Sequence, residues 1–358
     1  MKVSRLIALV LAAACIFTFT ACGKETGEGA AEDYPVSAAG TVIDRKPQVV
    51  VSLAPAITDT LAELQLLGRL AAISDYCTLP CETADLEYYE YPRVGTQQLP
   101  DMEAIKALGA DTVLTTTTLT ENQLLELQQA NIDVVVLEPA EDMDGIRQNY
   151  TDLFKVLYGE VTGGRMAEEY LANFDRRYED IQRRVEEAVA ARERPISAVY
   201  LAGDLLELAT GDSFEGYILE EMGLTNWGAD YTGYSYPKEK EVELNPDVVF
   251  YGDQISRDYI ASSSCYKTTD AGTAGAIYYL DPEDFERQSP DLLDRMWAMG
   301  RILYPDYFVQ EQPGDWSDIY GTEPVDNSYI PGEDEPAAAE PDTADTDAGS
   351  TGDSSAAE

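Results

Sequence analysis

Short apolar runs alternate with amphipathic stretches along the first half of the chain. The apolar runs have the length of strands and lie at 48–53, 70–73, 111–114 and 133–137. Helical spacing of apolar residues marks 102–108 and 121–130, and Thr58 or Asp59 is placed to cap a helix after the first run. This alternation predicts βα units that build a parallel sheet.

One long amphipathic stretch, at 165–192, interrupts the alternation. Charged positions separate apolar residues that recur every three or four places, which are Met166, Tyr170, Phe174, Tyr178, Ile181, Val185 and Val189. A helix of this length is roughly 40 Å long, about the width of a domain. Pro195 disfavours helical backbone at Arg194, so we expect the helix to end there.

The βα pattern resumes after the long helix. Strand-like runs lie at 196–201, 247–251 and 276–280, and helical stretches lie at 215–222 and 290–303. We therefore predict an α/β fold with two βα lobes, at 41–160 and 195–310, bridged by one long α-helix at 161–194. In parallel sheets ligands bind beyond the carboxyl ends of the strands, so the loops at those ends are the candidate site.

The N-terminus has the pattern of an export signal. After two positive residues an apolar run covers 6–19, which is shorter than the roughly 20 residues that span a bilayer. The residues from Phe19 to Cys22 resemble a bacterial lipobox, so we predict a lipoprotein signal peptide at 1–21 and a lipid on Cys22. The alternative is an ordinary secretory signal that leaves Cys22 as a free thiol. A Gly-, Ala- and Glu-rich stretch at 22–40 is predicted to be a flexible tether.

Charge excludes one class of partner. The formal net charge is −43, and nucleic-acid binding needs a basic face, of which the sequence shows none. Fourteen acids and no Lys or Arg lie from Glu311 onward. We predict that 311–358 is an acidic low-complexity tail that is largely disordered.

The chain has no histidine, which removes histidine-activated nucleophiles, histidine zinc sites and histidine-bound haem. Carboxylate chemistry remains open on an enzyme hypothesis, with Asp204, Asp212 and Asp253 as candidates. Cys77 and Cys81 can close a small disulfide loop, stay free thiols or bind metal. The metal alternative is the weakest, because no second cysteine pair completes such a site.

An internal echo relates the two lobes. Glu103 stands eight residues before Asp111, Glu239 stands eight before Asp247, and each glutamate begins a predicted short helix that leads into a strand. Two explanations are open. A glutamate in the first turn can bond back to the cap residue and favour the helix dipole. Alternatively, two equivalent lobes each present one acid to a symmetric partner that carries arginines.

Five segments in order resemble a known family. They are SLAPAITD at 52–59, SDYC at 74–77, RVG at 93–95, NPDVV at 245–249 and FERQSP at 285–290. Around a long helix and behind a lipobox, they resemble the substrate-binding proteins of ABC importers for iron-siderophores and cobalamin. The resemblance implies two Rossmann-like lobes, a rigid helix between them and a ligand cleft with little hinge closure. It also implies that Glu103 and Glu239 dock on arginines of a dimeric permease.

The resemblance and the loop positions together mark candidate ligand-binding residues, which are Pro55, Tyr76, Gln97, Thr116, Tyr234, Tyr236 and Arg287. Tyr76 can instead be a packing residue, and Arg287 a solvated arginine paired with Glu283 or Glu286. Gln97 and Thr116 stand where cobalamin binders of this type place tryptophans, which favours a more polar ligand.

The implied function is a monomeric solute receptor, not an enzyme. It captures an iron chelate or a corrinoid and delivers it to the permease and ATPase of an ABC importer. A lipid on Cys22 holds it outside the cytoplasm, at the cell surface or in the periplasm. No cofactor or resident metal is expected, although the ligand itself can carry iron or cobalt. Two alternatives stay open: a carboxylate- or metal-dependent enzyme on the same scaffold, and a non-transport surface adhesin.

Overall fold

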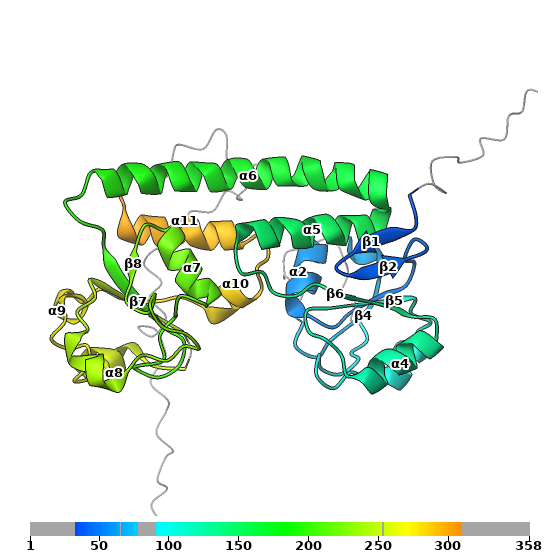
Figure 1. Cartoon of the computed structure of the whole chain (residues 1–358), viewed down its shortest axis with the longest axis horizontal. Helices are drawn as coiled ribbons and strands as arrows, with labels where there is room; N and C mark the ends of the chain where they lie inside the picture. The colour runs from blue at the N-terminus through cyan, green and yellow to red at the C-terminus, as the bar shows by residue number, and fades with distance from the viewer. Residues whose placement is uncertain (1–32, 65, 78–90, 253, 310–358) are drawn as a thin grey trace, which may run out of the picture. The chain divides into compact units, whose positions relative to one another are not determined.

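The computed structural model describes residues 33–64, 66–77, 91–252 and 254–309 (Figure 1). The predicted signal peptide, the predicted lipidation site Cys22 and the predicted acidic tail lie outside the described residues. Among the helices that the structure describes, none has both the length and the apolar character that crossing a membrane requires.

The first lobe is built on a parallel sheet with strand order β4-β3-β5-β6. Its strands are β3 (Val50–Ser52), β4 (Leu70–Ile73), β5 (Thr112–Thr115) and β6 (Asp133–Val136). Its helices are α2 (Pro55–Glu63), the 3-10 helix η1 (Leu67–Arg69), α3 (Met102–Ala107), α4 (Glu121–Gln129) and α5 (Met143–Tyr158). Val50 and Leu114 pack into one core, while Val51 and Val113 pack into another, because successive strand residues point to opposite faces.

The second lobe repeats this plan with strand order β10-β9-β7-β8, again all parallel. Its strands are β7 (Ser197–Leu201), β8 (Thr225–Asn226), β9 (Val248–Tyr251) and β10 (Ile277–Tyr279). Its helices are α7 (Phe214–Glu221), the 3-10 helix η2 (Lys238–Glu243), α8 (Arg257–Ser262), α9 (Asp270–Ala274), α10 (Pro282–Glu286) and α11 (Leu292–Leu303). Both sheets therefore have the parallel βα architecture that the sequence predicts.

The aspartates of the internal echo, Asp111 and Asp247, make equivalent hydrogen bonds in the two lobes. The carboxylate of Asp111 accepts hydrogen bonds from the backbone N–H groups of Gln48, at 2.9 Å, and Val49, at 3.2 Å, just before β3. The carboxylate of Asp247 accepts from the N–H of Ser197, at 2.8 Å, where β7 begins. In each lobe the aspartate thus ties the start of one strand to the start of its neighbour.

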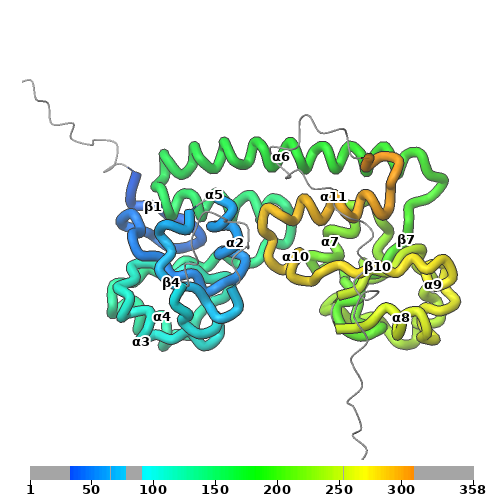
Figure 2. Tube along the Cα trace, turned by 180° about the vertical axis from the view of Figure 1, so that it is seen from behind, coloured from blue at the N-terminus to red at the C-terminus, as the bar shows by residue number. Residues whose placement is uncertain are grey.

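Helix α6 (Glu160–Ala190) is the predicted bridge and lies along both α5 and α11 (Figures 1 and 2). It ends four residues before the predicted boundary at Arg194. Gly163 lets α5 come close, because a Cβ at this position would lie 2.4 Å from the carbonyl oxygen of Phe154. Met143, Ile146 and Tyr150 of α5, which follows the lobe 1 sheet, share one hydrophobic core with α11 and the lobe 2 sheet.

The described residues begin at Asp33, inside the stretch at 22–40 that is predicted to be a flexible tether. Strands β1 (Val36–Ala38) and β2 (Thr41–Ile43) form an antiparallel hairpin. Just ahead of it, the carboxylate of Asp33 accepts hydrogen bonds from the N–H groups of Val161 and Thr162 and so caps α6. Gly159 at the N-cap has no side chain for this purpose. A three-residue strand carries too few apolar positions to show a period in the sequence.

The start of α2 corrects another expectation. Thr58 and Asp59 do not cap this helix but lie buried inside it. Pro55 occupies the first turn, where its fixed φ favours helix and its missing N–H costs nothing. The sequence pattern does not indicate a helix at α5, although this element shares a core with lobe 2.

Candidate functional site

Three of the four lobe 1 candidates directly follow strand ends. Pro55 comes after β3, Tyr76 after β4 and Thr116 after β5. The amide of Gln97 donates to the hydroxyls of Thr116, at 2.6 Å, and Thr117, at 2.9 Å. The structure thus brings Gln97 and Thr116 together into a wall of amide and hydroxyl groups. Tyr76 is 65% exposed, so it is not a packing residue of the core.

The two lobe 2 tyrosines, only two residues apart, have different surroundings. Tyr234 is 37% exposed and its hydroxyl donates to Glu215, at 2.8 Å. Its φ of 56° lies in the left-handed region, so the loop holds it in a strained backbone conformation. Tyr236 is 6% exposed and packs edge-on against Tyr231 within the core. The expectation that Tyr236 faces the ligand is corrected, because its ring belongs to the core of lobe 2.

Arg287, which follows β10 and α10, reaches across to lobe 1. Its guanidinium donates to the carboxylate of Asp59 on α2 at 2.8 Å and also pairs with Glu283. Burial raises the pKa of the Asp59 carboxyl to about 6, although Arg287 opposes the rise. The sequence suggests that Arg287 pairs with Glu283 or Glu286, and the pair with Glu283 is present. The contact of Arg287 with Asp59 in addition joins the two lobes.

Gln288 joins the lobes beside this ion pair. Its side-chain amide accepts from the N–H of Ala140 at 2.7 Å and donates to the carbonyl of Ala140 at 2.8 Å. The hydroxyl of Tyr150 on α5 donates to the Gln288 carbonyl at 2.7 Å. All three bonds are buried, where hydrogen bonds are strong and expensive to leave unmade. This junction fits an interlobe geometry with little hinge motion.

A small cavity of about 60 Å³ lies at this junction. Thr116 and Arg287 both line it, so two of the predicted ligand residues from different lobes meet there. Neighbouring positions in its wall include Ala56, Thr60, Glu286 and Gln288. Pockets for small molecules are typically about 300 to 1,000 Å³, so this cavity accommodates a small part of such a ligand.

Cys77 is buried beside the loop that follows β4. Its sulfur accepts a hydrogen bond from the hydroxyl of Thr58 at 3.1 Å and lies 3.3 Å from the hydroxyl oxygen of Ser74. Among the described residues its thiol is free, as is the buried thiol of Cys265. Cys81 lies outside the described residues, so the pairing of Cys77 with Cys81 stays a prediction.

The two echo glutamates are both exposed at the surface. Glu103 lies in the first turn of α3, as predicted, and its side chain contacts Lys106 at 2.5 Å. Glu239 lies in η2, a 3-10 helix. Neither carboxylate bonds back to its cap residue in the part of the chain that the structure describes. Asp101 caps α3 with its own carboxylate, and Pro237 at the start of η2 has no N–H to bond.

Comparisons with known proteins place this architecture in a family. A family model described as "Periplasmic binding protein" matches residues 50–283. The uncharacterized ABC transporter substrate-binding lipoprotein YvrC of Bacillus subtilis is 23% identical over 282 residues, covering 75% of this chain and 83% of YvrC. A cobalamin-binding protein of Halobacterium salinarum is 26% identical over 274 residues, covering 73% of this chain and 71% of that protein.

Solved structures share the fold. Helicobacter pylori CeuE with Ni(II) bound has a TM-score of 0.60 at 17% identity, over 76% of this chain and 89% of CeuE. A periplasmic heme-binding protein of Pseudomonas aeruginosa has a TM-score of 0.57 at 20% identity, over 72% of this chain and 93% of that protein. At such identities the likeness concerns fold alone.

The matched residues span most of both lobes and the whole of α6. The family consists of binding proteins for transport, so the expectation of a receptor is confirmed and the enzyme alternative on Asp204, Asp212 or Asp253 is wrong. With a family model matched over residues 50–283, this chain belongs to the periplasmic binding protein family.

Proposed function

We propose that this protein is the extracytoplasmic solute receptor of an ABC-type importer and that it captures an iron chelate or a corrinoid. The observation that carries the proposal is the meeting of Thr116, after β5, and Arg287, after β10, in one cavity wall. The carboxyl ends of two parallel sheets then face a shared site, which is where ligands of such sheets bind. A relative named as cobalamin-binding and a fold neighbour with bound Ni(II) support this ligand class.

The proposal includes a permease that the receptor contacts through both lobes. Glu103 and Glu239 are exposed, occur once per lobe and make no back-bond to a helix cap. A carboxylate that does not bond to a helix cap is available to pair with an arginine on a two-fold symmetric partner. The interlobe bonds of Arg287 and Gln288 keep the two glutamates in a set arrangement for such docking.

The predicted lipid on Cys22 belongs to the same proposal. A relative is named as a lipoprotein, which supports the anchor. A lipid confines the receptor to the membrane that holds the permease and so raises the effective concentration for docking. Mass spectrometry of the native protein tests it: the mature N-terminus is expected at a diacylglyceryl-modified Cys22, and an unmodified cysteine would contradict it.

A binding titration tests the ligand class. The purified protein is titrated with a ferric hydroxamate chelate, a ferric catecholate chelate, haem and cobinamide while intrinsic fluorescence is followed. We expect saturable binding of at least one compound, with a Kd on the order of micromolar or lower. A flat response to the whole panel would contradict the proposed ligand class.

A cavity-filling variant ties any binding to the proposed site. Thr116→Trp places a bulky ring in the cavity wall and is expected to weaken binding at least tenfold. Thr273→Trp is the matched control, because Thr273 is exposed on α9, which precedes β10 and so lies away from the strand ends. Equal binding by both variants would place the ligand elsewhere.

A further inference from the structure

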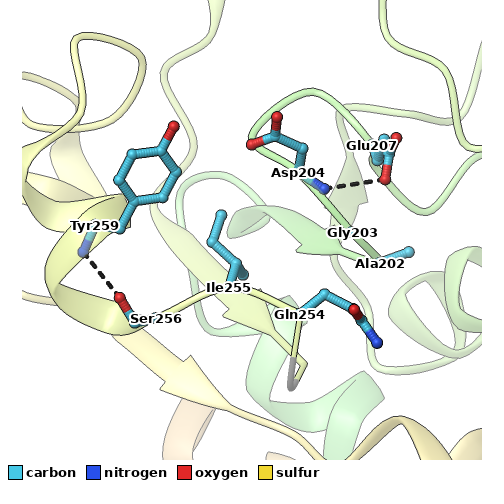
Figure 3. Close-up of a pocket in the computed structure, with 8 residues that line it drawn as sticks. All are labelled: Ala202, Gly203, Asp204, Glu207, Gln254, Ile255, Ser256 and Tyr259. Atoms are coloured by element: carbon cyan, nitrogen blue, oxygen red, sulfur yellow. Dashed lines mark hydrogen bonds between the residues drawn. The ribbon is translucent and has the colours of Figure 1, made fainter.

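A second and larger cavity lies in lobe 2 at the carboxyl ends of β7 and β9 (Figure 3). Its volume is about 590 Å³, which is within the range of small-molecule sites. Its polar wall comes from two loops and the first turn of α8, and the residues that matter here are Asp204, Glu207, Gln254, Ser256 and Tyr259. The side chain of Ile255 lies between the Asp204 and Tyr259 side chains in Figure 3 and supplies an apolar surface.

Two carboxylates in this wall are held in place by backbone groups. Glu207 accepts from the N–H of Asp204 at 3.0 Å, and Asp204 accepts from the N–H of Leu205 at 2.8 Å. Each bond uses one oxygen, so each carboxylate keeps an oxygen for a bound molecule. Among the described residues that line the cavity there is no lysine or arginine. The wall therefore offers fixed hydrogen-bond acceptors and a negative potential.

The guanidinium groups of Arg287 and Arg93, which lie elsewhere at the strand ends, already bond to other groups of the protein. Arg287 is engaged by Asp59 and Glu283. Arg93 donates to the backbone carbonyls of Ser74, at 2.8 Å, and Cys77, at 2.6 Å. An anionic solute would meet these occupied guanidiniums on one side and the carboxylates of lobe 2 on the other. Like charges brought close together without compensation disfavour binding.

We propose that the lobe 2 cavity selects the charge of the solute, taking an end that is positively charged or rich in N–H donors. This inference rests on the proposed function and narrows it. Cationic hydroxamate chelates and corrinoids fringed with amides have the required chemistry. Haem, with its propionates, and ferric tris-catecholates do not. Among the described side chains no group of three or more His, Cys, Asp or Glu could hold a metal ion.

Two matched ligand pairs test the inference. The first compares cobinamide with cobyrinic acid, in which carboxylates replace the amides on the same ring. The second compares a cationic ferric hydroxamate with an anionic ferric catecholate. We expect the amide or cationic member of each pair to bind at least tenfold tighter near physiological salt, and the ratio to shrink at high salt. Tighter binding of the acidic members would overturn the inference while leaving the proposed function intact. Binding of none of the four would overturn both.

Side-chain variants test whether Asp204 and Glu207 cause the charge preference between the ligands of each pair. Asp204→Asn with Glu207→Gln keeps the shape of the wall and removes two charges, so the preference in each pair should fall severalfold. Asp306→Asn with Glu193→Gln removes the same charge at two exposed positions outside both cavities. The control should keep the wild-type ratio. An unchanged ratio in the first variant, with a normal thermal midpoint, would contradict the role of this wall.

A different observation concerns the docking face. Val242 and Leu99 are 91% and 78% exposed, the two highest values among the exposed large apolar side chains of the described residues. Val242 lies three residues after Glu239, and Leu99 lies four before Glu103. We infer that each docking acid is accompanied by an apolar anchor, and that the partner is the external face of the permease, with an apolar recess beside each arginine. Apolar anchors next to matched charges are common at protein interfaces.

The anchors are tested by Leu99→Ser with Val242→Ser, measured for solute uptake and for ligand affinity. Uptake is expected to fall at least tenfold while affinity stays at the wild-type value. Val42→Ser with Val161→Ser is the control, since these side chains are 58% and 69% exposed and stand apart from both glutamates in the sequence. Unchanged uptake, or an equal loss in the control, would overturn the anchors. Lost ligand affinity would instead place these residues in the solute site.

Discussion

The two lobes are alike at the sheet edge where their strands begin, and they differ at the opposite edge, where their strands end. At the beginnings, Asp111 and Asp247 make equivalent bonds to the neighbouring strand. At the finishing ends, lobe 1 presents Gln97 hydrogen-bonded to threonine hydroxyls, whereas lobe 2 presents the carboxylates of Asp204 and Glu207. The beginnings are constrained by the fold, while the loops beyond the strand ends are free to suit a ligand.

The docking acids also differ between the lobes. Lys106 contacts Glu103 at 2.5 Å and Glu126 at 2.7 Å, so the charge of Glu103 is partly compensated. Glu239 makes no ion pair with any described residue. The two lobes therefore present unequal potentials to a symmetric partner. On the proposed docking role, we therefore expect lobe 2 to contribute more of the docking energy.

The largest expected effect comes from removing both docking acids. Glu103→Ala with Glu239→Ala should lower solute uptake by roughly a hundredfold or more, because an interfacial charge left without its partner costs several kcal/mol. Ligand affinity should not change. Of the single variants, Glu239→Ala should lose more uptake than Glu103→Ala. Uptake in vesicles containing the permease measures all three, and an equal loss in both single variants would remove the inequality between the lobes.

The bond between the lobes should depend on pH. The pKa of Asp59 is raised to about 6 by burial, with Arg287 lowering it and Asp291 and Glu283 raising it. A carboxyl whose pKa is raised on folding favours the folded state when protonated, and this contribution is lost as pH rises through about 6. Arg287→Ala removes the opposing charge, so the pKa of Asp59 rises further.

The variant should therefore lose little stability at pH 5, about 1 kcal/mol, and more at pH 8, about 3 kcal/mol. Urea unfolding at the two pH values measures the difference. Arg257→Ala is the control, since Arg257 donates a hydrogen bond to the carbonyl of Gly275 within lobe 2. A loss that is equal at both pH values would contradict an ion pair with Asp59.

The echo aspartates should stabilise the two lobes unequally. Asp247 accepts from Ser197 N–H and hydroxyl and from both terminal nitrogens of Arg194, whereas Asp111 bonds two backbone N–H groups and the hydroxyl of Thr112. Asp247→Ala is expected to cost about 2 kcal/mol and Asp111→Ala about 1 kcal/mol. Arg194 holds the pKa of Asp247 well below its usual range, so this contribution is present above about pH 4 and is lost in acid. Urea midpoints of both variants at pH 7 and pH 3 check the ranking.

Much of the fold followed from the sequence. Seven strands were placed because buried parallel strands form continuous apolar runs bounded by loops. The hairpin of β1 and β2 was missed because each strand has three residues. The role of Asp59 was missed for a different reason: its partner Arg287 lies far along the chain, and local rules place an acid near a strand end as a helix cap. Pairings between lobes leave no local signal.

The candidate site was predicted less fully. Glu103, Glu239 and Thr116 lie where the sequence placed them, because each is fixed by a strand that follows or precedes it. The sequence pattern does not indicate the lobe 2 cavity, although Asp204 is among the candidates of the enzyme hypothesis. Its two walls come from separate loops, after β7 and after β9, and only the sheet brings them together. A single sequence carries no record of that proximity.

The smallest effect expected here concerns two tyrosines that the sequence could not separate. Tyr234 is partly exposed and bonds Glu215, while Tyr236 is buried against Tyr231. Tyr234→Phe removes a hydroxyl at one of the proposed ligand-binding positions and is expected to weaken ligand binding about threefold, with no change in stability. Tyr236→Phe should leave binding unchanged, because its ring remains in the core. Fluorescence titration and thermal unfolding of both variants separate the two roles, and a larger binding loss at Tyr236 would place the ligand against the core of lobe 2.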